Sequence, residues 1–175
     1  MTGEAARPLL EALAAKRDAI VEAWLVRTLQ SYPEHTSRFL SREQDPFKNP
    51  VGHTLAEALP ALFDRLVEGA DAATLSRILD PVVRMRAVQD FSAGQAVAFL
   101  FLLKRVLREA LGGERRGGAG GEGLTALEAR IDEMALLAFD LFMQCRERIY
   151  EIRANEAKRR RFVPERIREK RAGAG

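Results

Sequence analysis

The sequence predicts an all-α protein that forms a single compact domain of five to six helices, packed as an antiparallel bundle. Leu, Ala, Arg and Glu dominate the composition and β-branched residues are sparse, a mixture that favours helices over strands. Apolar residues recur every three or four positions in five segments, as in helices with one buried face. The length of 175 residues, 47% of them hydrophobic, fits one core. A globin-like arrangement without haem is the alternative topology.

The first helix is predicted from about residue 8 to residue 30, because its apolar residues fall largely on one face. Pro8 suits the first position of a helix, where a backbone N–H is not needed. The segment 31–33 (SYP) is expected to end this helix. The polar stretch 34–48 that follows carries no helical prediction.

The second helix is predicted to begin at Pro50, with Asn49 as its cap, since Asn favours the position just before a first turn. Pro60 lies inside the apolar pattern and is expected to kink the helix. Gly69 is expected to end it.

Asp71 can cap the third helical segment. Asp80 and Pro81 are expected to interrupt this segment, because proline lacks the N–H that a helix interior needs. A second piece should restart there, with Asp80 as its cap, and continue to about Asp90.

Ser92 and Gln95 form a capping box that opens the fourth helix, which runs to about Leu111. Over 96–103 this helix is apolar nearly all round. Such a pattern is typical of the most buried helix of a domain.

Seven glycines lie within 112–123, and they predict a mobile loop. Thr125 and Glu128 form a second capping box, which opens the longest helix, 124–161. This helix should pair antiparallel with the fourth helix across the loop. Val163 and Pro164 are expected to break it.

The apolar residues of the last helix alternate by three and four positions, which is the spacing of a seam between two helices. The seam consists of Ile131, Ala135, Ala138, Phe142, Cys145, Ile149 and Ile152. By analogy with coiled coils, we expect a homodimer through this seam.

The net charge is only +3, yet residues 146–171 hold eleven Lys or Arg against five Asp or Glu. We therefore divide the chain into a helical domain, 1–153, and a basic C-terminal arm, 154–175. The cluster 158–161 (KRRR) fits a solvated helix end, a grip on nucleic acid or a contact with an anionic membrane surface. Because the arm has almost no aromatic residues for base stacking, we expect no nucleic-acid binding, and membrane-surface contact is the alternative.

The chain is poor in groups that carry out chemistry. Its only cysteine is Cys145 and its only histidines are His35 and His53, too few for a tetrahedral metal site of about four donors. No nucleophile lies beside a base in a recognisable motif, and no histidine lies on a late helix where it could ligate haem. We expect a protein that is not an enzyme, without a cofactor. The unpaired cysteine and the absence of a signal peptide favour the cytoplasm.

The most distinctive polar cluster consists of Arg84, Arg86, Gln89 and Asp90, beside a very apolar helix. One interpretation is structural: Asp90 pairs with Arg86 across one helical turn, which adds only a few tenths of a kcal/mol. The other is functional: the four side chains contact a ligand or a partner protein. We take the cluster as the candidate binding site.

Several motifs resemble, in their order, the N-terminal domain of the RsbT co-antagonist protein RsbRD. They are 45–52 (DPFKNPVG), 84–91 (RMRAVQDF), 96–99 (AVAF), 138–140 (AFD) and 145–150 (CRERIY). The resemblance covers the chain from about residue 9 to about residue 160.

This resemblance implies a helical sensory domain of the stress response, which acts in signal transduction by protein–protein contact. In RsbRD such a domain precedes a phosphorylatable STAS domain, and none follows here, so we expect a stand-alone domain without that output mechanism. Stand-alone relatives are associated with sulfur-metabolising anaerobes. That association implies, as an alternative, an adaptor or sensor serving a membrane electron-transfer complex. A small-molecule-binding helical domain is the other alternative.

Overall fold

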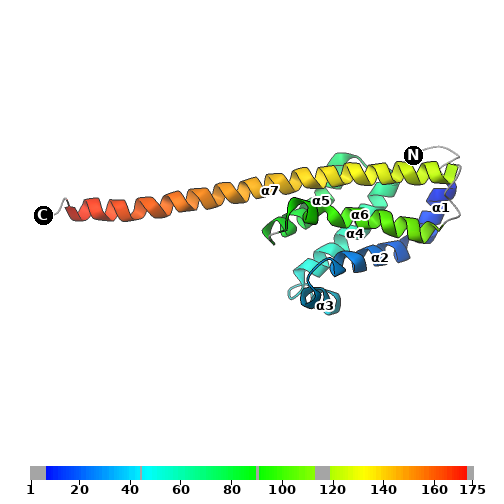
Figure 1. Ribbon diagram of the computed structural model, residues 1–175, viewed down its shortest axis with the longest axis horizontal. Coiled ribbons are helices and arrows are strands. Elements are labelled where there is room, and N and C mark those ends of the chain that lie inside the picture. Colours follow the sequence, from blue (N-terminus) through cyan, green and yellow to red (C-terminus); the bar gives the residue numbers. More distant parts are fainter. Residues whose placement is uncertain (1–6, 44, 90, 113–118, 173–175) are drawn as a thin grey trace.

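The computed structural model confirms the all-α class. It describes residues 7–43, 45–89, 91–112 and 119–172, and within these ranges there are seven helices and no strand. The helices are α1 (Arg7–Ala15), α2 (Arg17–Gln30), α3 (Glu34–Arg42), α4 (Pro50–Glu68), α5 (Ala72–Val88), α6 (Ala93–Leu111) and α7 (Ala119–Ala172). The first six helices and the beginning of α7 form a packed body, from which the rest of α7 projects as a single long helix (Figure 1).

The helix predicted from residue 8 to residue 30 is divided into α1 and α2 at Lys16. Backbone hydrogen bonds run across the division, and the Lys16 ammonium donates to the Ala110 carbonyl at the end of α6, at 2.6 Å. The change of direction lets α1 bury Leu9 and Leu13 while α2 buries Trp24. The division therefore follows from tertiary packing, which the local pattern did not reveal.

The polar stretch 34–48 contains a helix that the sequence did not predict, α3. Its one buried residue is Leu40. Asn49 holds the end of this helix, because its side-chain amide donates to the carbonyls of Leu40 and Glu43, both at 2.8 Å. Because α3 has only one buried apolar residue, its sequence has no apolar stripe, and hydrophobic periodicity could not predict this helix.

The caps of α4 are confirmed. The Asn49 side chain accepts from the Gly52 N–H at 2.8 Å, and a Cβ at Gly52 would lie 2.3 Å from the Asn49 amide nitrogen. Gly69 ends the helix in the left-handed conformation, with φ of 88°. Pro60 lies within the continuous helix.

The predicted interruption of the third segment at Asp80 and Pro81 is wrong, since α5 is continuous through both residues. Val82 and Val83 are fully buried directly after Pro81, and this burial holds the helix together despite the missing hydrogen bond. Asp80 acts as an ion-pair partner of Arg84 instead of a cap. The cap predicted at Asp71 is confirmed: its side chain accepts from the Thr74 N–H at 2.8 Å.

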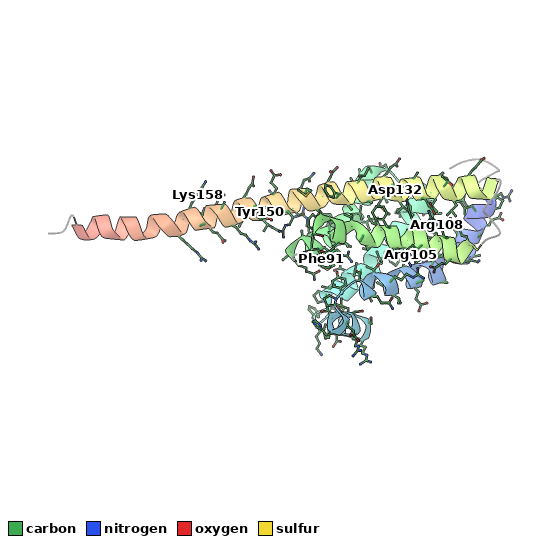
Figure 2. The ribbon with its side chains drawn as sticks, viewed as in Figure 1. Phe91, Arg105, Arg108, Asp132, Tyr150 and Lys158 are labelled. Carbon is green, nitrogen blue, oxygen red and sulfur yellow. The ribbon has the colours of Figure 1, made fainter. Side chains whose placement is uncertain are left out.

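The antiparallel pairing of α6 and α7 is confirmed (Figure 1). Lys104 pairs with Asp132 at 2.6 Å, and Arg108 pairs with Glu128 at 2.7 Å. Four residues further along α6, the partner on α7 lies four residues earlier, as antiparallel helices require. Figure 2 shows Arg108 and Asp132 along this contact. The capping box of Ser92 at the start of α6 is confirmed as well.

Both predicted ends of the last helix are wrong. The helix begins at Ala119, within the glycine segment, and the Thr125 hydroxyl donates to the Gly121 carbonyl at 2.9 Å, so Thr125 is an interior residue and not a cap. Gly123 lies against α1, where a Cβ would be 2.9 Å from Leu9 Cδ2. At the other end the helix continues through Pro164. Proline removes one hydrogen bond, and the strong helix formers Arg, Lys and Glu predominate on either side, in 156–161 and 165–171.

The first half of the predicted seam packs inside this same chain. Ile131, Ala135, Ala138 and Phe142 are buried in the core, whereas Ile152 is exposed. Among the described residues, none of the helices has both the length and the apolar character to cross a membrane.

Candidate functional site

The predicted polar cluster lies at the C-terminal end of α5, but its members point in different directions. Arg84 is exposed and donates through Nε to Asp80 at 2.6 Å. Arg86 is completely buried, with 0% of its surface exposed, and Gln89 is at the surface. Asp90 lies outside the described residues. Arg84 and Arg86 therefore do not share a site.

The Arg86 guanidinium is enclosed by three aromatic rings. Its Cζ atom lies 4.7 Å from the centre of the Phe99 ring, 5.2 Å from that of Phe91 and 5.4 Å from that of Tyr32. At these distances the guanidinium makes cation–π interactions with the rings. These interactions compensate part of the free-energy cost of removing the charge from water. The rings come from three places: the α2–α3 connection, the α5–α6 turn and α6.

Arg86 is only partly satisfied by hydrogen bonds. Nη1 donates to the carbonyls of Gln95 and Ala96, at 3.3 and 3.2 Å, in the first turn of α6. Nε and Nη2 are buried and have no hydrogen-bond partner among the described residues. Burial lowers the pKa of Arg86, while the neighbouring Tyr32 raises it by a smaller amount.

A groove of about 680 Å³ lies directly outside this aromatic enclosure. Its lining consists of Ser31, Tyr32, Pro33, Thr36, Leu40, Val51, Gln89, Phe91 and Gln95. Three of these residues also contact the Arg86 guanidinium: the rings of Tyr32 and Phe91, and the Gln95 carbonyl. Figure 2 places Phe91 at the end of the body from which α7 projects. The structure thus places one predicted residue, Gln89, in the lining of the groove, and a second, Arg86, fully buried behind the rings of Tyr32 and Phe91.

Tyr32 is the central residue of the groove wall. It is buried, its ring meets that of Phe91 edge to face at 5.3 Å, and its hydroxyl donates to Gln89 Oε1 over a long 3.5 Å. Burial raises the pKa of the Tyr32 phenol, so the hydroxyl is neutral near pH 7. Sequence reasoning took Tyr32 only as part of a helix end, and no local signal linked it to a residue more than fifty positions away.

Arg84 belongs to a second, smaller cavity of about 280 Å³ between α5 and α7, which it lines together with Cys145. Burial raises the pKa of the Cys145 thiol, and the positive charge of Arg84 lowers it by a smaller amount. The thiol is therefore mostly protonated near neutral pH, which makes it a poor nucleophile.

The described part of the chain holds no group of three His, Cys, Asp or Glu side chains arranged to bind a metal ion. The histidines lie apart, and His53 pairs with Glu57 at 3.3 Å on the exposed face of α4. The chemistry that the groove offers is recognition, through aromatic faces and amide groups, with a buried cation behind its wall.

Comparison with known proteins supports the resemblance. No curated protein and no solved structure matches the chain. Residues 18–157, most of the chain, match the family described as the RsbT co-antagonist protein rsbRD N-terminal domain. This family indicates a regulatory domain of stress-response signalling. With the match extending from α2 into the projecting part of α7, the chain belongs to the RsbRD N-terminal domain family.

Proposed function

We propose that this protein is a non-catalytic regulatory domain that transmits a signal by protein–protein contact, and that the contact is a homodimer formed through the outward face of α7. The observation that carries the proposal is a row of exposed apolar side chains along this helix. Its members are Leu136, Phe139, Met143 and Tyr150.

The spacing of the row is that of a helix–helix interface. Leu136, Phe139 and Met143 are separated by three and then four residues, and Tyr150 follows one heptad after Met143. This is the a/d repeat with which one helix packs against another. Leu136 is 68% exposed, an unusual position for a large apolar side chain unless a partner covers it.

The exposed row differs from the seam expected from the sequence. Ala138 and Phe142 of that seam pack against the chain's own helices, so they are not available to a partner. The exposed row lies on the side of α7 next to α6, because it shares that face with Asp132, the partner of Lys104. On α6 itself, Phe101 adds a further exposed apolar side chain.

The composition of the described surface supports a role in binding and not in catalysis. The Cys145 thiol is held protonated, and the nearest charged partner of His53 is a carboxylate on its own helix. Asp80 lines the same cavity as Cys145, and its negative charge raises the pKa of the thiol further, which opposes activation of the thiol as a nucleophile.

The decisive experiment replaces Leu136 with Glu and measures molar mass by size-exclusion chromatography with light scattering. We expect the unchanged protein to elute as a dimer and Leu136→Glu as a monomer with the same helical circular dichroism, because a buried unpaired carboxylate opposes association. Val26→Glu is the matched control, since Val26 is 45% exposed on α2, outside the row, and should leave the dimer intact. A monomeric unchanged protein, or a dimeric Leu136→Glu variant, would contradict the proposal.

A further inference from the structure

We infer that the groove beside Arg86 is a binding site for a small organic carboxylate, which the Nε and Nη2 atoms of Arg86 hold as a pair. The inference goes beyond the proposed dimer, because it assigns the chemical class of a ligand to a different part of the molecule. It starts from the two buried N–H groups of Arg86 that have no partner among the described residues.

The same pair of atoms binds carboxylates elsewhere in this chain. Arg17 donates through Nε and Nη2 to the two carboxylate oxygens of Asp64, both at 2.7 Å. Arg108 donates through the same two atoms to Glu128, again at 2.7 Å each. This side-on fork matches the spacing of a carboxylate's two oxygens. In Arg86 the fork has the same geometry but meets no carboxylate of the described residues.

The energetics of burial favour an anion at this position. A guanidinium removed from water needs a counter-charge or a complete set of hydrogen bonds, and its desolvation otherwise costs several kcal/mol. Among the described residues, Arg86 has two carbonyls on Nη1 and three aromatic rings around Cζ, but no negative charge. A carboxylate on the fork would supply both the charge and the two missing acceptors.

The groove is the opening beside the fork, although Arg86 itself is fully buried and does not line it. Tyr32 and Phe91 line the groove and also contact the guanidinium, so the two rings separate Arg86 from the outside. Their mutual contact is edge to face, and the polar bond of Tyr32 to the exposed Gln89 is 3.5 Å long. Entry of a ligand to the fork therefore requires these two rings to rotate away from the guanidinium.

The size and lining of the groove define the rest of the ligand. A volume of about 680 Å³ lies in the range of small-molecule sites. Leu40, Val51 and Phe91 offer apolar contact, and Thr36 and Gln95 offer polar groups at the edge. A carboxylate carried on a compact aromatic or aliphatic body fits this combination.

Benzoate and benzamide form the matched probe pair, because they share a ring and differ in charge. We expect isothermal titration calorimetry on the full chain to detect benzoate binding and no benzamide binding, and inorganic phosphate to leave the benzoate affinity unchanged. Equal binding of the two aromatic probes, no binding of benzoate at millimolar concentration, or phosphate displacing benzoate would each overturn the assignment.

Three variants test the residues. Arg86→Lys keeps the charge and removes the fork. It should weaken the affinity for benzoate by about ten- to a hundredfold, which corresponds to the loss of a charge-assisted hydrogen-bond pair. Thr36→Trp fills the groove from its partly exposed rim and should abolish binding without a change in thermal midpoint, which keeps the test valid if Arg86→Lys does not fold. Arg84→Lys is the control and should bind like the unchanged protein. Benzoate binding that survives both Arg86→Lys and Thr36→Trp would refute the site.

Asp90 requires its own variant, since it lies outside the described residues and follows Arg86 by four positions. If the chain's own Asp90 occupied the fork in solution, Asp90→Asn would gain a benzoate affinity that the unchanged protein lacks, and the inference would be wrong. We expect Asp90→Asn and the unchanged protein to bind benzoate alike. Leu136→Glu should also bind benzoate normally, so a failure of the dimer proposal and a failure of this site are distinguishable.

Discussion

Between residues 127 and 142, α7 buries six side chains against the other helices, whereas from residue 150 to residue 160 every side chain of the same helix is exposed. The buried part packs mainly against α5 and α6. The exposed part, which includes Tyr150 and Lys158, extends beyond the body (Figure 2). The helix has no break between the two parts.

The difference shows that one continuous helix can be stabilised in two ways. The inner part is held by tertiary burial, which contributes about 1.5–3 kcal/mol for each large apolar side chain. The outer part depends on the helix propensity of its Arg, Glu, Lys and Ala residues, which contributes far less per residue. Substitutions in the two parts should therefore differ in their effect on global unfolding.

The largest effect is expected for Phe142→Ala, compared with Ile152→Ala. Phe142 is buried, so its truncation leaves a cavity and should lower the free energy of unfolding by about 3 kcal/mol in urea denaturation. Ile152 is exposed, and its truncation should change that free energy by less than about 0.5 kcal/mol. Equal losses would mean that the outer part of α7 is buried in solution.

The next effect is expected for Arg130→Ala, compared with Arg153→Ala. Arg130 donates to the Leu66 carbonyl in the last turn of α4 and to the Ala70 carbonyl just beyond the helix, and so ties α7 to the end of α4. Its removal should cost about 1 kcal/mol of unfolding free energy by the same measurement. Arg153 is exposed on the outer part, so its replacement by Ala should leave the midpoint of unfolding unchanged.

Cys145 marks the border between the two parts, and its reactivity reports the burial there. Because burial raises the pKa of its thiol, less thiolate is present in the folded protein than in the unfolded chain at pH 8. We expect iodoacetamide to alkylate the native protein several-fold more slowly than the protein in urea, with the ratio falling as the pH rises above the folded pKa. A native rate equal to the unfolded rate at pH 8 would show that the border residue is not shielded.

The smallest global effect is expected for Ala157→Gly, for which Ala138→Gly is the matched substitution in the buried part. Glycine costs about 1 kcal/mol of helix propensity at either position. At Ala157 this cost should appear only as faster amide hydrogen exchange around the substitution, because the outer part can fray without unfolding the body. At Ala138 it should lower the global midpoint, and a lowered midpoint at Ala157 would contradict the comparison.

Local signals in the sequence were sufficient at most helix ends where the interaction itself is local, and the capping box predicted at Thr125 is the exception. The caps at Asn49, Asp71 and Ser92 and the glycine stop at Gly69 were all predicted, and each depends on hydrogen bonds within about four residues. Pro81 was misread because the buried valines that follow it act through contacts distant in the sequence.

The candidate site was predictable only in part for the same reason. Arg86 and Gln89 were singled out by their pattern; Gln89 lines the groove, and Arg86 is buried directly behind its wall. Tyr32 lies 57 residues from Gln89 along the chain, and the sequence contained nothing to associate the two. Arg84, which looked equivalent to Arg86, faces α7 and pairs with Asp80.

By itself the sequence determined that this protein is helical, where most helices begin, that the last two pair antiparallel, and which family it resembles, because periodicity, capping and motif order are written in neighbouring residues. Only the tertiary structure decided which arginine is buried and which apolar row of α7 is exposed. Burial depends on which faces meet in space, and a helix carries several candidate faces whose use is settled only when the other helices pack against it.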